Sequence, residues 1–307
     1  MSEPAIAARS SSNWLSIPER GSVLGIRFMV WAVGIGGRSF ARAVLWFVMV
    51  YFFAFSARAR RASRDFLARL EQPHRTSDVF GHLLRFGQVA LDRLLLVQGK
   101  TSNFDFDLGP RELFEELQSA DKGALLLGAH VGSFEALAGM ARHFDLSVGT
   151  VVNTGGSKMI TGVLRHLNPE LAASLIDLDK GRLDAIFEVR RRLENGQHIG
   201  VLADRVVPAE KFVVVPFLGQ DARFPAGPFV LAAAMGCPVY FVAALYRGGN
   251  RYEVYAQRLA DRVVLPREDR EAGLRKYAGL YSEHLERLVR VAPTNWFNFF
   301  DFWDVSE

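Results

Sequence analysis

Short apolar runs alternate with stretches of helical periodicity along most of the chain, and this alternation constrains the fold more than any other feature. Strands are expected at 124–127, 147–152, 174–178, 198–203, 212–216, 239–245 and 251–257. Helices are expected at 76–97, 133–142, 158–167, 182–194, 227–235 and 267–291. Strands that alternate with helices indicate an α/β fold with one mixed central β-sheet flanked by helices.

A histidine follows the first of these strands at once. His130 is thereby placed at the carboxyl end of a strand, the usual position for chemistry in an open α/β sheet. Glu135 falls in the first turn of the next helix, where its carboxylate is expected to accept the imidazole N–H and fix the tautomer. Such a pair predicts a general base that takes a proton from an alcohol or an amine. A buried core histidine fits the same spacing, so the pair alone leaves catalysis open.

The composition favours an anionic partner. Half of the 307 residues are hydrophobic and the net charge is +4, which suits a membrane surface or a phosphorylated lipid. No nucleic-acid motif is present, no Gly-rich turn indicates a nucleotide cofactor, and no G-x-S-x-G indicates an α/β-hydrolase. The histidines lack the spacing of metal ligands. The single cysteine, Cys237, excludes a disulfide and indicates a reducing compartment.

The N-terminal region predicts a membrane-associating helical segment at 14–72, after a disordered tail at 1–13 and before an α/β domain at 73–307. Residues 23–55 are apolar apart from Arg27, Arg38 and Arg42, which fall within about 60° of one another on a helical wheel. The charge-free piece 43–57 is shorter than the roughly 20 residues that a spanning helix needs. A helix or helical hairpin lying in the interface, a single span and a pair of core helices therefore all stay open.

Arginines follow this segment closely and form a cationic collar, made of Arg58, Arg60, Arg61 and Arg64. Beside an apolar segment, such a collar is expected to contact anionic headgroups on the cytoplasmic side of the membrane. A solvated helix face is the alternative interpretation.

Five motifs in the right order resemble the lysophospholipid acyltransferase superfamily, and most closely its bacterial lipid A late acyltransferase branch. They are His130-Val-Gly-Ser-Phe-Glu135, Ile199-Gly-Val-Leu-Ala-Asp204-Arg205, Val214-Val-Pro216-Phe217-Leu218-Gly219 with Pro225-Ala-Gly227-Pro, Ala233-Ala-Met-Gly236-Cys-Pro238-Val239, and Ala292-Pro293-Thr-Asn-Trp296. The resemblance runs from about residue 14 to residue 303.

The resemblance implies transfer of a fatty acyl group from a thioester, carried on acyl carrier protein or coenzyme A, to a hydroxyl or amine of a lipid or glycolipid. His130 would be the general base and Glu135 its orienting carboxylate, with no cofactor besides the thioester co-substrate. The enzyme would act at the cytoplasmic face of the bacterial inner membrane, as a monotopic or single-span protein.

Four further residues are predicted to bind substrate, namely Lys158, Asp204, Arg205 and Phe217. Lys158 and Arg205 are candidates for stabilising the oxyanion or for holding an acceptor phosphate, and Asp204 is expected to brace the site at a strand end. The backbone N–H groups of the Gly132-Ser133 turn are the other candidate oxyanion donors.

The chain departs from the branch at two places. Val206 stands where a second acid is usual, and His166-Leu-Asn-Pro169 replaces an arginine-rich stretch, so the acceptor stays open. The aromatic stretch 295–303 predicts an acyl-chain groove, a segment that dips into the membrane, or a core-packing tail. A non-catalytic protein of the same fold that binds lipid or acyl carrier, and a hydrolase that releases fatty acid, are the competing hypotheses.

Overall fold

A seven-stranded mixed sheet forms the centre of the molecule in the computed structural model, which describes residues 23–71, 74–109, 111–152, 168–178, 181–207 and 210–303. The strand order is β1-β9-β8-β2-β5-β3-β4. The strands are β1 (Asp105–Asp107), β2 (Leu125–Gly128), β3 (Val148–Val152), β4 (Leu175–Asp177), β5 (His198–Leu202), β8 (Val239–Gly248) and β9 (Arg251–Ala260). Only β8 and β9 pair antiparallel within this sheet, through a hairpin, so the predicted mixed sheet is confirmed.

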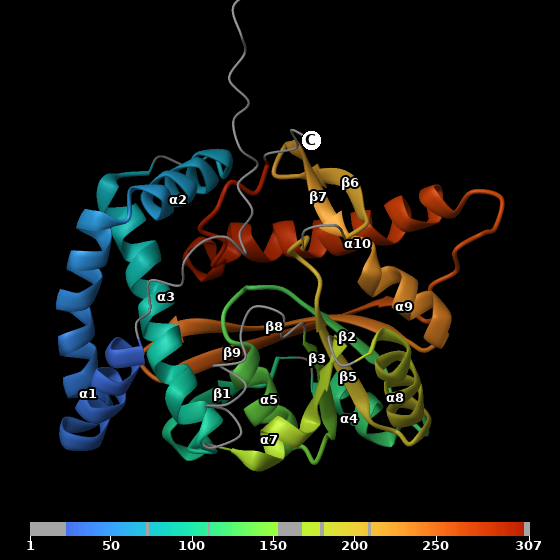
Figure 1. Cartoon of the computed structure of the whole chain (residues 1–307), viewed down its shortest axis with the longest axis horizontal. Helices are drawn as coiled ribbons and strands as arrows, with labels where there is room; N and C mark the ends of the chain where they lie inside the picture. Colours follow the sequence, from blue (N-terminus) through green and yellow to red (C-terminus); the bar gives the residue numbers. More distant parts are fainter. Residues whose placement is uncertain are drawn as a thin grey trace, which may run out of the picture.

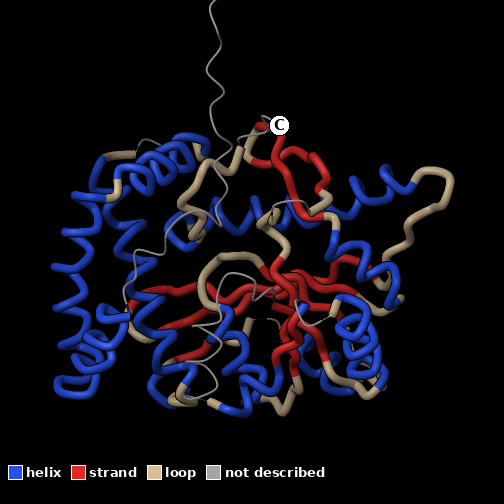
Figure 2. The backbone as a smooth tube through the Cα atoms, viewed as in Figure 1, coloured by secondary structure: helices blue, strands red, loops and turns tan. Residues whose placement is uncertain are grey.

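Helices cover both faces of the sheet (Figures 1 and 2). They are α1 (Val23–Phe55), α2 (Ala57–Arg69), α3 (Thr76–Val97), α4 (Arg111–Ser119), α5 (Phe134–His143), α7 (Pro169–Ser174), α8 (Arg182–Glu194), α9 (Gly227–Met235) and α10 (Arg270–Val291). Figure 1 shows α9 and α10 above the sheet, α4 and α5 below it, and α1 to α3 at one end. The helix expected at 158–167 lies outside the described residues.

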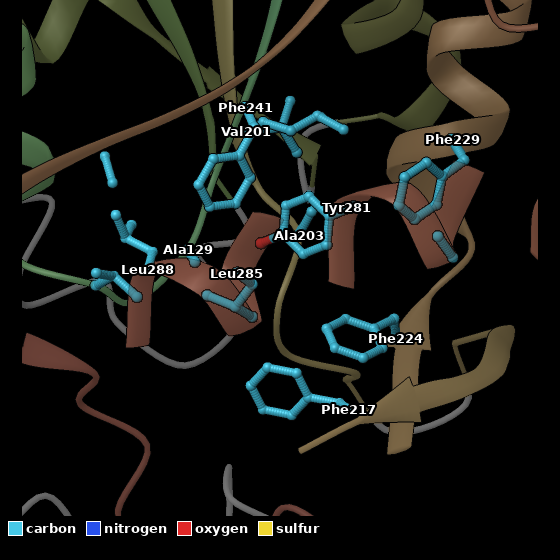
Figure 3. Close-up of a cluster of buried hydrophobic side chains, with 14 of the residues drawn as sticks. Ala129, Val201, Ala203, Phe217, Phe224, Phe229, Phe241, Tyr281, Leu285 and Leu288 are labelled. Carbon is cyan, nitrogen blue, oxygen red and sulfur yellow. The ribbon is translucent and has the colours of Figure 1, made fainter. Parts of the chain in front are cut away.

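The alternation of side chains along the strands divides the core into two layers. Leu125 and Leu127 of β2 face a cluster that includes α8, α9 and α10, whereas Leu126 packs against the cluster of α3, α4 and α5. This division follows from the period of two in a β-strand, where neighbouring side chains point to opposite faces. In the first layer, Tyr281 lies among the buried hydrophobic side chains (Figure 3). Its hydroxyl donates to the carbonyl oxygen of Gly128 at 2.7 Å, and this bond ties α10 to the end of β2.

Two strands, β6 (Phe212–Phe217) and β7 (Gln220–Pro225), form a separate antiparallel hairpin. The strand expected at 212–216 is therefore present, but it does not join the central sheet. Its burial alternates strictly, and the buried side chains pack on α10 and on the C-terminal segment.

Helix α1 is broken at Gly37, whose φ is 68° and ψ is −169°. Beyond the break, Ala41, Leu45 and Met49 are buried against α3, while Phe47 and Tyr51 are exposed. The stretch Phe28–Phe55 is long and apolar enough to cross a membrane by composition, and most of it is not buried.

Two of the three arginines expected on one face of the N-terminal helix, Arg38 and Arg42, are directed inward. Arg38 forms two hydrogen bonds of 2.7 and 2.6 Å with the carboxylate of Asp92 on α3, and Arg42 lies 3.3 Å from the same carboxylate. Asp92 is fully buried and also accepts a hydrogen bond from Tyr252 at 3.0 Å. Arg38 and Arg42 therefore fasten α1 to the α/β domain and are not aimed at lipid headgroups.

Candidate active site

Strands β2 and β5 are neighbours in the sheet, and their parallel register places His130 beside Asp204. Gly128 and Leu202 are paired at the ends of the two strands, and His130 and Asp204 each follow two residues later. Because both strands end at the same edge, their next polar side chains meet there. The position of His130 at the carboxyl end of a strand is thus confirmed.

The imidazole of His130 is bonded to Asp204. Its Nδ1 lies 2.7 Å from Oδ1 of Asp204, and the backbone N–H of His130 donates to Oδ2 of the same carboxylate at 2.9 Å. Since an ionised carboxylate only accepts hydrogen bonds, Nδ1 carries the proton and Nε2 keeps its lone pair. The carboxylate therefore fixes the tautomer that a general base requires.

Asp204 is held ionised by its surroundings. The side chain is fully buried, and burial alone would raise the pKa of its carboxyl group. The charges of His130 and Arg205 and the hydrogen bonds from His130 outweigh burial and lower this pKa to about 2. The amide of Asn298 adds a further hydrogen bond to Oδ2, at 3.0 Å.

Asn298 joins Asp204 to Arg205. The amide oxygen of Asn298 accepts from Nε of Arg205 at 2.7 Å, and Nη2 of Arg205 donates to the carbonyl oxygen of Phe297 at 3.0 Å. The C-terminal segment is therefore part of the site, a role that sequence reasoning missed. The signal in the sequence was the presence of two asparagines, Asn295 and Asn298, among the aromatic residues of 295–303. Both asparagines are buried in the structure.

Glu135 does not occupy the position expected for it. Its carboxylate pairs with the guanidinium of Arg93 on α3 and accepts a hydrogen bond from the hydroxyl of Ser133 at 3.3 Å. The expectation that Glu135 accepts the imidazole N–H is thus wrong in this structure, because the N–H at Nδ1 is bonded to Asp204 instead. The physical reason is the strand register, which brings a residue from 74 positions away closer than the one five positions away.

The turn after His130 is locked by the sheet. Gly132 has a φ of 63°, its N–H donates to the carbonyl of Asn295 at 2.8 Å, and the N–H of Ser133 donates to the carbonyl of Ala244 at 2.9 Å. The hydroxyl of Ser133 then caps α5 through the N–H of Ala136. Both N–H groups expected to stabilise an oxyanion are therefore already bonded, so that expectation was wrong.

The other predicted substrate-binding residues have different positions. Phe217 is fully buried among the hydrophobic side chains of the core (Figure 3). It stacks on Trp303 with 5.8 Å between the ring centroids, so it cannot contact a substrate there. Arg205 lies beside the site, but its guanidinium is bonded to the C-terminal segment. Lys158 lies outside the described residues.

The aromatic stretch 295–303 packs mainly as core, which favours the core-packing tail among the three interpretations of it. Trp296, Phe297 and Phe302 are all buried. The carbonyl oxygen of Trp296 accepts from Nε2 of His82 at 2.7 Å, and Nδ1 of His82 lies 2.9 Å from the hydroxyl of Ser63. Helices α2 and α3 thus hold the segment that carries Asn298.

Protonation of His130 is disfavoured at rest. Burial and the charge of Arg205 lower the pKa of its imidazole, against the raising effect of Asp204. About a quarter of the side chain, 27 %, is nevertheless exposed, so a substrate can approach it. Within the described residues, no group of three or more His, Cys, Asp or Glu side chains is placed to hold a metal ion.

A family of known proteins matches this chain over most of its length. The model of the family described as bacterial lipid A biosynthesis acyltransferase matches residues 90–304, which include His130, Asp204, Arg205 and Asn298. A search of curated proteins found no match.

Proposed function

The chain belongs to the bacterial lipid A biosynthesis acyltransferase family and is an acyltransferase; from that premise, we propose that His130 is the general base of its reaction. The reaction would move a fatty acyl group from a thioester of acyl carrier protein or coenzyme A to a hydroxyl or amine of a lipid or glycolipid. The observation that carries the proposal is the bond between Nδ1 of His130 and the buried carboxylate of Asp204, which leaves Nε2 free to accept a proton.

Proton transfer and acyl transfer proceed in one cycle. Nε2 of His130 takes the proton of the acceptor hydroxyl or amine as its oxygen or nitrogen attacks the thioester carbonyl carbon. The tetrahedral intermediate collapses, the carbon–sulfur bond breaks, and the imidazolium returns the proton to the leaving thiolate. Asp204 stabilises the imidazolium in between, so it has the orienting role that the sequence motif suggested for Glu135.

The negative charge on the oxygen of the tetrahedral intermediate needs a stabilising group other than the backbone N–H groups of the turn after His130. With the N–H groups of Gly132 and Ser133 bonded to carbonyl oxygens, a cationic side chain is the better candidate. Arg205 is buried beside Asp204, and burial lowers its pKa to about 10, so it stays protonated at neutral pH.

The exposed face of α1 supports association with a membrane. Phe40, Phe47, Tyr51 and Phe55 form an uncharged stripe, here called the aromatic stripe, and each is between 45 and 69 % exposed. A large exposed apolar surface of this kind marks a binding site, and an acyl acceptor embedded in a bilayer requires one. Arg61 and Arg64 are exposed on α2, at the end of α1, where they can contact anionic headgroups.

Insertion in the plane of the interface is favoured over a complete span. The break at Gly37 and the ion pairs of Arg38 and Arg42 with Asp92 interrupt the apolar stretch and fix its inner face to α3. The proposed location is the cytoplasmic face of the bacterial inner membrane, because acyl thioesters are formed on that side.

Matched substitutions test the proposed roles. His130→Gln is expected to abolish acylation of the lipid fraction by acyl-carrier and acyl-coenzyme A donors, and Asp204→Asn to lower kcat by about 10²–10⁴-fold. Mass spectrometry of lipids from cells with and without the gene would identify the acceptor. Full turnover by His130→Gln would refute the assignment of His130 as the general base. Release of free fatty acid without any acylated lipid would favour a hydrolase. Thioester binding without consumption would favour a non-catalytic protein.

A further inference from the structure

Arg93 is an exposed cation beside the proposed base that the reaction as described does not use. It lies on α3, and 59 % of its side chain is exposed. Its partner Glu135 is only 15 % exposed and is also bonded to Ser133, in the turn that follows His130. The carboxylate is thus fixed, while the guanidinium presents its remaining N–H groups to solvent.

The charge of Arg93 reaches the reacting group. After burial and Arg205, Arg93 is a further influence that lowers the pKa of His130, and it also lowers the pKa of Arg205. Two cations therefore disfavour the imidazolium, namely Arg205, which is held by the C-terminal segment, and Arg93, which is exposed and paired with Glu135 in the first turn of α5. An anionic group of a substrate entering from solvent would meet Arg93 first.

An apolar surface adjoins this cation. Phe86 precedes Arg93 by two helical turns on α3, is 38 % exposed, and packs its edge on Phe297 with 5.5 Å between the ring centroids. The N–H of Phe297 donates to the carbonyl oxygen of His130 at 2.8 Å. An exposed cation and an exposed aromatic ring thus share one helix face next to the base, an arrangement that suits an anion joined to an apolar body.

We propose that Arg93 binds a phosphate ester of a substrate, and that Glu135 holds the guanidinium in place until the phosphate arrives. The proposal rests on the acyltransferase function above. The guanidinium of Arg93 is the exposed member of the pair, and the carboxylate of Glu135 keeps its hydrogen bond from Ser133 when Arg93 turns away. A phosphate that accepts two parallel N–H bonds can therefore compete with the carboxylate for the guanidinium. Phosphates occur both in coenzyme A or the pantetheine arm of a carrier protein and in the headgroups of phospholipids and phosphorylated glycolipids.

Kinetics with matched substrates test this role. Arg93→Ala is expected to raise the KM of acyl-coenzyme A or of a phosphorylated acceptor at least about tenfold, with kcat nearly unchanged. The KM of the matching phosphate-free substrate should not change. That substrate is acyl-N-acetylcysteamine for acyl-coenzyme A, and the dephosphorylated acceptor for the phosphorylated one. The substrate whose KM rises then shows whether Arg93 binds the phosphate of the donor or that of the acceptor. Arg93→Lys should recover only part of the loss, because lysine cannot form the bidentate contact. Arg275→Ala is the matched control, since Arg275 is 52 % exposed and pairs with Glu271 on α10.

Equilibrium binding separates this proposal from the acyltransferase function. Dissociation constants are measured for the unsubstituted protein and for Arg93→Ala. Coenzyme A is compared with pantetheine, which lacks its phosphates, and lysophosphatidic acid is compared with monoacylglycerol. Loss of the preference for one phosphate-bearing ligand supports the proposal even if turnover is absent. An equal loss for ligands with and without phosphate, or a shifted pH profile with unchanged KM, would overturn it, because Arg93 would then act only through His130.

Discussion

The surroundings of His130 determine the pH range in which the proposed base works. Burial and Arg205 lower the pKa of the imidazole, and Asp204 raises it. Because the base is active when unprotonated, kcat/KM should be constant at neutral pH and fall only below the ordinary histidine pKa of about 6.5. In Asp204→Asn, the loss of the carboxylate should move the acidic limb to still lower pH. A profile of acyl transfer from pH 5 to 8 checks both, and a limb above pH 7 in the native protein would contradict the assignment.

The backbone at Gly132 limits substitution beside the base. A Cβ atom there would collide with the carbonyl oxygen of Ala244, and φ is 63°. Gly132→Ala should therefore displace the turn, lower the free energy of unfolding by about 1–3 kcal/mol, and reduce acyl transfer.

Gly219→Ala is the control for this substitution. Gly219 has a φ of 77°, but a methyl group added there would meet no atom within 4 Å, so only the backbone penalty applies. Equal losses of stability in the two variants would show that the contact with Ala244 does not constrain the turn.

Helix α3 joins three functional parts of the molecule. His82 holds the C-terminal segment, Asp92 holds α1, and Arg93 faces the site. His82 and Arg93 are eleven residues apart and therefore lie on one face of α3, whereas Asp92 lies on another. Helix α3 thus fixes the proposed membrane segment and the proposed base relative to each other.

Removing the charge of Asp92 should detach α1. Asp92 is fully buried, and the side chains of its partners Arg38 and Arg42 are about 20 % exposed. Asp92→Asn leaves two mostly buried cations without an anion, which should lower the free energy of unfolding by about 3–5 kcal/mol. Asp261→Asn, whose ion pair with Arg258 is exposed, should cost at most about 1 kcal/mol. Denaturant unfolding in detergent measures both, and similar losses would contradict the structural role.

Protonation of His82 should destabilise the fold in acid. Burial lowers the pKa of its imidazole to about 4, although the bond to the carbonyl of Trp296 raises it. The neutral form favours folding fully above pH 6.5, and this contribution is lost as the pH falls toward 4. Between pH 8 and 5, the wild type should therefore lose about 2 kcal/mol more of its unfolding free energy than His82→Gln does. Parallel losses would show that His82 does not titrate in this way.

Local sequence patterns predicted most helices and strands, whereas the pairing of strands far apart in the sequence determines which side chains meet at the site. The periodicity of α3 and α8 gave their bounds correctly, because each buries one face over several turns. The three-residue strand β1 was missed, because so short a strand carries no periodicity. The meeting of His130 with Asp204 depends on β2 lying beside β5, which no pattern within either segment encodes. Sequence reasoning therefore named both residues but joined His130 to Glu135.

The whole molecule has an asymmetric surface. The aromatic stripe covers α1 at one end, and the site lies where β2 and β5 end, with α3 between the two (Figure 1). An acceptor drawn from a membrane on the α1 side would therefore reach His130 past α3, along the face that carries Phe86 and Arg93. Membrane contact and acyl transfer should accordingly depend on the same end of the molecule.

A charge placed in the aromatic stripe should prevent membrane binding. Phe47 is 69 % exposed, and Phe47→Arg puts a cation where the stripe would enter the acyl boundary, which opposes insertion. Phe187→Arg on α8 is the matched control, because Phe187 is 68 % exposed but lies on a different helix. Co-sedimentation with anionic phospholipid vesicles should decrease for Phe47→Arg alone, and acylation of a vesicle-embedded acceptor should fall with it. Turnover of a soluble short-chain acceptor should stay near the native value, since the bond between His130 and Asp204 is untouched. If instead Phe187→Arg releases the protein and Phe47→Arg does not, the membrane-facing surface lies on α8 rather than on α1.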